Sequence, residues 1–160
     1  MYEYIVLLHV VGAFLFALSH GVSLFASVRL RGTRTREEVA ALLNLSQLSI
    51  GGLYLGLLLL LIGGVWAGFA GDHWGSGWIW AALGTLVVVI VAMYAMATPF
   101  YGRMRVASGV TTDPKMVERF GEFTPEELAA MAASSRPLIL AAIGGIGVLV
   151  ILWLMVVKPF

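Results

Sequence analysis

The chain has 160 residues, of which 60% are hydrophobic and 12% charged, and its mean hydropathy is +0.94. A soluble domain of this length cannot bury so large a share of apolar side chains, so the composition excludes an ordinary soluble protein. Ten Lys and Arg nearly balance nine Asp and Glu, and the net charge of +1 does not favour nucleic acid as a partner. The absence of Cys excludes disulfides and thiolate metal sites.

Four long runs without Asp, Glu, Lys or Arg follow one another along the chain. They cover residues 4–28, 48–70, 78–98 and 138–157. At about 1.5 Å per residue, each run is long enough as a helix to cross a hydrocarbon core of about 30 Å. Backbone amides in lipid must bond within their own segment, and the runs lack the alternation of transmembrane strands. The sequence therefore predicts an all-α membrane protein, a four-transmembrane-helix up-down bundle forming one membrane domain over residues 1–160.

The segments around these runs carry further helix signals. A helical pattern at residues 37–47 predicts that the second helix begins before its apolar run. Thr124, Pro125 and Glu127 form a capping-box start, so a short surface helix is expected from Pro125 to about Ser134. No basic segment precedes the first run, and we expect it to be a retained helix rather than a cleaved signal peptide.

Basic residues are distributed unevenly among the connecting loops. Nine of the ten lie in the loops at residues 29–47 and 99–137, and none lies in the loop at residues 71–77. They are Arg29, Arg31, Arg34, Arg36, Arg103, Arg105, Lys115, Arg119 and Arg136. Because basic loops are retained in the cytoplasm, both termini and the 71–77 loop are expected outside. Four tryptophans surround that loop: Trp66, Trp74, Trp78 and Trp80. We interpret them as an aromatic belt at the membrane surface, and the alternative is an aromatic box that binds a cofactor.

His9 and His20 lie inside the first run, where an ionisable residue suggests a functional site. Eleven residues turn a helix about 20° beyond three full turns, so the two rings share a face about 16.5 Å apart and cannot share a metal. That face also holds Gly12, Ser23 and Ser27, a composition typical of helix packing. Each histidine is either a ligand of haem b or copper, or a structural residue bonded to a neighbouring carbonyl or hydroxyl.

The depth of each residue in its run indicates which partners are available. His9 is level with Met155 on the fourth run, whereas His20 is level with Tyr54 on the second run and with Met93 and Tyr94 on the third. No second histidine lies at either depth. A haem or copper bound here would therefore have one His ligand, or one His and one Met ligand. A second His ligand would require that His73 folds inward from its loop or that a second chain contributes.

Glycines mark expected close contacts between helices. Gly52 and Gly56 form a GxxxG motif, Gly63 and Gly64 follow on the same run, and Gly144, Gly145 and Gly147 lie on the fourth. The four runs contain no charged residue, which argues against an ion-coupled transporter and a hydrolase. We do not expect an enzyme.

The segment Leu8-His9-Val10-Val11-Gly12-Ala13, with a basic loop after the first run and three further runs, resembles a family of small bacterial four-span membrane proteins of unknown function. More distantly it is similar to the CopD-type copper-resistance membrane domain and the HemJ-type protoporphyrinogen oxidase. The resemblance implies a multi-pass protein of the bacterial inner membrane in which His9 would serve copper or haem. A non-catalytic accessory or structural subunit of a larger membrane complex, or a homo-oligomer, is the alternative.

Overall fold

The computed structural model describes residues 2–33 and 35–160, so Met1 and Arg34, one of the nine basic loop residues, lie outside the described part. This part contains helices and no strand. The long helices are α1 (Tyr2–Leu30), α2 (Arg36–Ala70), α3 (Gly77–Ala107) and α6 (Arg136–Val157), and the short ones are α4 (Pro114–Phe120) and α5 (Pro125–Ala133). All four long helices are long and apolar enough to cross a membrane. The predicted all-α fold is confirmed.

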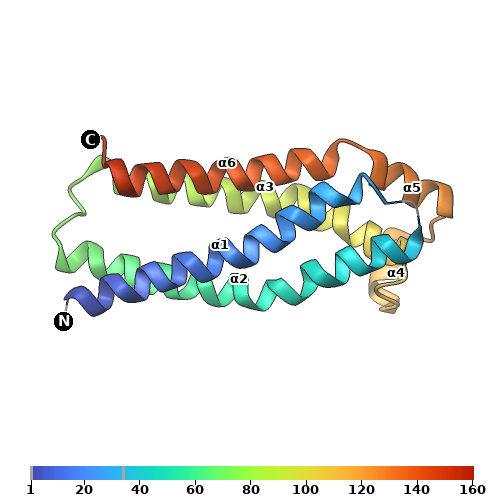
Figure 1. The fold of residues 1–160 in the computed structure, drawn as a ribbon, viewed down its shortest axis with the longest axis horizontal. Helices are drawn as coiled ribbons and strands as arrows, with labels where there is room; N and C mark the ends of the chain where they lie inside the picture. The colour runs from blue at the N-terminus through green and yellow to red at the C-terminus, as the bar shows by residue number, and fades with distance from the viewer. Residues whose placement is uncertain (1, 34) are drawn as a thin grey trace.

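Successive long helices run in opposite directions (Figure 1). Both termini and the α2–α3 loop lie at one end of the bundle, here called the Trp end after Trp74, Trp78 and Trp80. The α1–α2 turn, α4 and α5 lie at the opposite end, here called the Arg end after Arg29, Arg36, Arg103 and Arg136 at the helix termini found there. The bundle is therefore up-down, with its two short helices together at the Arg end.

Local signals explain where the helices begin. The Thr124 hydroxyl accepts from the Glu127 amide at 3.2 Å and the Glu127 carboxylate accepts from the Thr124 amide at 2.8 Å, which confirms the predicted capping box of α5. A second box, between Thr35 and Glu38, starts α2 at Arg36. The helix continues without a break to Ala70, as the pattern at residues 37–47 predicted.

Two helical features were not predicted. Asp113 caps α4 by accepting from the Lys115 amide at 3.0 Å, and Pro114 occupies the first turn. In addition α3 continues through Pro99 to Ala107, beyond the apolar run. Pro99 removes one backbone hydrogen bond, but Phe100 and Met104 just after it are buried against the other helices and hold the last turns in place.

The bundle consists of two helix pairs. In the α1–α2 pair, four of the five buried residues of α1 recur every seventh position, at Ile5, Gly12, Ser19 and Ala26. On α2, Gly56 lies against Phe16 and the Gly12 carbonyl, and Gly63, seven residues later, lies against His9. A Cβ atom on Gly56 would lie 2.4 Å from the Phe16 amide nitrogen, so the two backbones are in direct contact. The other pair is α3 and α6, where a Cβ on Gly147 would meet Val89 at 2.4 Å.

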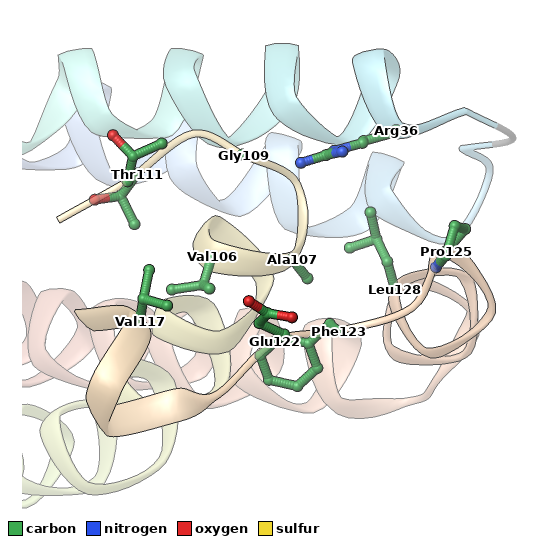
Figure 2. Close-up of a pocket in the computed structure, with 11 residues that line it drawn as sticks. Arg36, Val106, Ala107, Gly109, Thr111, Val117, Glu122, Phe123, Pro125 and Leu128 are labelled. Carbon is green, nitrogen blue, oxygen red and sulfur yellow. The ribbon is translucent and has the colours of Figure 1, made fainter. Parts of the chain in front are cut away.

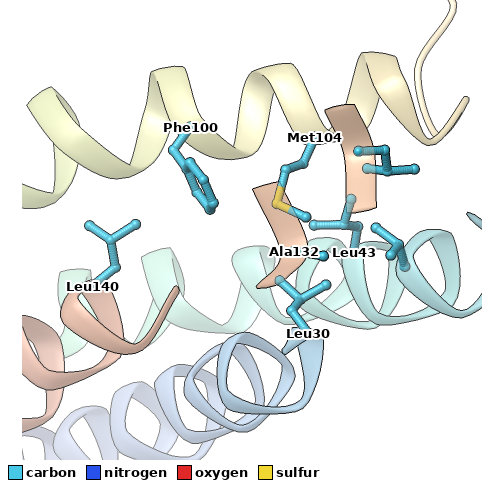
Figure 3. Packing of buried hydrophobic residues seen from close by; sticks show 8 residues of the cluster. Leu30, Leu43, Phe100, Met104, Ala132 and Leu140 are labelled. Atoms are coloured by element: carbon cyan, nitrogen blue, oxygen red, sulfur yellow. The ribbon is translucent and has the colours of Figure 1, made fainter. Parts of the chain in front are cut away.

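The pairs join at the Arg end. One buried cluster takes residues from α1, α2, α3, α5 and α6 (Figure 3). Its members are Leu30, Val39, Leu43, Phe100, Met104, Leu128, Ala132 and Leu140. At the Trp end the buried cluster contains only Trp78, Ile79 and Ala82 of α3 with Leu154 of α6. The α1–α2 pair is thus anchored to the rest of the protein mainly at its Arg end.

Candidate functional site: the two histidines of α1

His9 lies on α1 at a close backbone contact with α2. Its Nδ1 is 2.8 Å from the backbone oxygen of Leu60, and since a carbonyl oxygen can only accept, Nδ1 carries the proton and donates. Two glycines leave room for this arrangement. A Cβ on Gly63 would lie 2.6 Å from the His9 amide nitrogen, and one on Gly64 would lie 2.9 Å from Nδ1. The other ring nitrogen, Nε2, has no hydrogen-bond partner among the described residues.

His20 lies where α1 passes α6. Its ring stacks on Phe16 one turn earlier, with centroids 5.8 Å apart and planes 2° from parallel. The Nε2 atom is buried and has no partner within the described residues, and a Cβ on Gly144 would lie only 2.6 Å from it. The ring edge therefore rests against α6 at Gly144, and a larger residue there would displace the His20 ring.

The other predicted ligands lie at several places along the bundle. Met155 packs against the buried cluster at the Trp end, and Met93 packs against the cluster at the Arg end. Tyr54 is 65% exposed on α2, so its ring faces the surroundings of the bundle. His73 lies beside Trp78, with ring centroids 5.7 Å apart. Across residues 2–33 and 35–160 no three His, Asp or Glu side chains come close enough to hold a metal ion.

A set of hydroxyl groups joins three helices between the histidines and the Arg end. The Ser23 hydroxyl lies 3.1 Å from that of Ser46 and 3.0 Å from that of Ser49, linking α1 to α2. The Ser27 hydroxyl donates to the Ser23 carbonyl at 2.8 Å and lies 2.6 Å from the Tyr101 hydroxyl on α3. Ser23 and Ser27 share the predicted packing face of α1, but no sequence signal pointed to Tyr101, whose role depends on how α3 is rotated.

The tryptophans of the Trp end divide into two kinds. Trp66 and Trp80 are more than half exposed, as an aromatic belt requires, whereas Trp78 is buried with the Lys158 ammonium 5.3 Å from its ring centre. Trp74 lies over Gly68, where a Cβ would come within 2.9 Å of its ring, and its carbonyl accepts from the Trp80 indole at 3.0 Å. Trp74 therefore connects α2 to α3 across the short loop.

No family model, no curated protein and no solved structure matches the chain. The comparisons thus provide no family link to the copper-resistance domain or to the oxidase that the first helix resembles.

Proposed function

We propose that this multi-pass membrane protein is a non-catalytic accessory or structural subunit of a larger assembly in a bacterial inner membrane. The observation that carries the proposal is the environment of His9. The ring lies at a close backbone contact between two helices, and its Nδ1 donates to the Leu60 carbonyl. His20 likewise rests on the α6 backbone at Gly144. Both rings therefore contribute to helix packing, which suits a rigid membrane-embedded scaffold.

The proposal includes an orientation. The termini and the Trp end face the outside, and the Arg end, with α4 and α5, faces the cytoplasm. The support is electrostatic, because nine of the ten Lys and Arg residues belong to the two loops of the Arg end.

A cofactor role for His9 is the second candidate, and one specific observation favours it. Metal-bound histidines usually donate their other ring nitrogen to a carbonyl or carboxylate, as Nδ1 of His9 does to Leu60. Nε2 of His9 would then bind haem b as an axial ligand, or copper, and either group would supply redox chemistry. We propose the cofactor role for His9 alone, because the Nε2 of His20 lies against Gly144.

One set of measurements separates the candidates. The absorption spectrum and the copper and iron contents of the detergent-purified protein are recorded, together with its apparent mass after extraction from native membranes in mild detergent. The accessory role predicts no Soret band, metal far below one ion per chain, and a native complex larger than the purified chain in its micelle. A stoichiometric haem or copper that His9→Ala removes and His20→Asn retains would overturn it in favour of the cofactor. A native particle no larger than the purified chain would contradict membership of an assembly.

A further inference from the structure

A cavity of about 350 Å³ lies at the Arg end, between the ends of two long helices and the segments that connect α3 to α5. Its walls come from the start of α2, the end of α3, the loop that follows, α4, and the segment leading into α5 (Figure 2). The volume falls in the range of cavities that bind small molecules. The cavity lies directly beyond Arg103 and Arg105, which mark where the apolar part of α3 ends, and this places it at the level of the lipid headgroups.

Two opposite charges line this cavity without pairing with each other. The Arg36 guanidinium extends over it from α2, and the Glu122 carboxylate faces it from the segment before α5 (Figure 2). Neither has an ion pair or a side-chain hydrogen bond within the described part of the chain. The Thr111 hydroxyl also lines the space, and the remaining wall is largely apolar, with Val106 and Phe123 among its residues. A ligand that satisfies both charges must carry an anion and a cation.

The loop backbone leaves space for Arg36 in this position. Gly109 has a φ of +75°, a conformation that side chains other than glycine's rarely adopt, and a Cβ there would lie 2.6 Å from an Arg36 guanidinium nitrogen. The guanidinium thus occupies the space that a side chain at position 109 would fill. Gly109 therefore allows the charged group to lie over the cavity.

We propose that this cavity binds the headgroup of an amine-bearing phospholipid, with the phosphate on Arg36 and the primary ammonium on Glu122. A guanidinium binds phosphate through paired hydrogen bonds, and a primary ammonium has the N–H donors that a carboxylate accepts. The apolar wall suits the glycerol backbone next to the phosphate. This proposal goes beyond the accessory role and does not depend on it. The same phosphate and amine chemistry exists in free phosphoethanolamine, which is the soluble alternative.

The test uses the full-length protein in detergent, freed of lipid and then supplied with dioctanoyl phosphatidylethanolamine, with the corresponding choline or glycerol lipid, or with free phosphoethanolamine. Native mass spectrometry counts the molecules bound per chain. We expect one ethanolamine lipid per chain. Arg36→Gln should weaken its binding by about tenfold or more, since a charge-assisted hydrogen bond of about 1.5 kcal/mol or more is lost. Glu122→Gln should weaken binding of the ethanolamine lipid and leave binding of the choline lipid unchanged.

Arg31→Gln and Glu118→Gln are the matched controls, because both residues are exposed at the same end and neither lines the cavity. They should bind lipid as the wild type does, and circular dichroism checks that every variant keeps its helix content. The proposal would be overturned if Arg36→Gln and Arg31→Gln lost lipid binding equally, or if the protein preferred the anionic glycerol lipid. In either case general attraction to a basic surface would explain the binding. If free phosphoethanolamine binds as tightly as the lipid, the ligand of the cavity is the soluble compound and the lipid proposal is wrong.

Discussion

At the residue scale, His9 and His20 share a face of α1, as helical spacing predicts, but the fold uses them differently. The ring of His9 donates to a carbonyl on α2, whereas the ring of His20 stacks on Phe16 and rests on Gly144 of α6. Spacing along one helix gives the angle between two side chains. It cannot give the rotation and depth of the neighbouring helices, so a backbone partner such as Leu60 could not be predicted from the sequence.

Replacing His9 by Leu should destabilise the fold. The substitution removes the hydrogen bond between α1 and α2, and hydrogen bonds between membrane helices contribute about 0.6 to 1.7 kcal/mol. His9→Gln keeps a side-chain donor and should recover part of this loss. Thermal unfolding in detergent measures both variants. Tyr54→Leu is the control, since that ring is exposed on α2. If the His9→Leu variant has the melting temperature of the wild type, the His9 ring does not stabilise the contact between α1 and α2.

At the scale of elements, the α1–α2 pair illustrates what a glycine motif does and does not predict. The sequence identified Gly52 and Gly56 as close-approach points. In the structure Gly56 faces the backbone of α1, whereas Gly52 faces the Ser19 side chain, whose hydroxyl would lie 2.5 Å from an added Cβ. Gly12 and Gly63 belong to the same contact but fall outside the GxxxG spacing. The seven-residue recurrence along α1 became recognisable only with the partner helix beside it.

Gly56→Leu should destabilise the bundle more than Gly52→Leu. At position 56 the added side chain meets backbone atoms of α1, which can move only if the helices separate, and overpacking of this kind costs about 1–3 kcal/mol. At position 52 it meets a side chain instead. Gly51→Leu is a matched control on the same helix, because a Cβ there meets nothing within 4 Å. Chemical or thermal unfolding gives the order of stability of the three variants. If Gly51→Leu and Gly56→Leu lose equal stability, the α1–α2 contact described here is wrong.

At the scale of the whole molecule, the sequence predicted the helices best where composition determines them. Charge-free runs identified four helices, and the capping residues Thr124 and Glu127 located α5. The extension of α3 beyond Pro99 was missed because burial of Phe100 and Met104 outweighs the local signal of proline. The cavity at the Arg end was missed for a similar reason. It forms from Arg36, Gly109 and Glu122, which come together only through the tertiary fold.

The most direct test of the membrane arrangement uses the absence of native Cys, since a single introduced Cys is then the only thiol in the chain. Gly75→Cys places it in the loop at the Trp end and Glu118→Cys places it on α4 at the Arg end, and both positions are exposed. Each variant is expressed in bacterial cells and treated with a membrane-impermeant maleimide before and after permeabilisation. The proposed orientation predicts that the thiol of Gly75→Cys reacts in intact cells and that the thiol of Glu118→Cys reacts only after permeabilisation. The opposite result would reverse the proposed orientation, and labelling of both variants in intact cells would contradict the four-span arrangement itself.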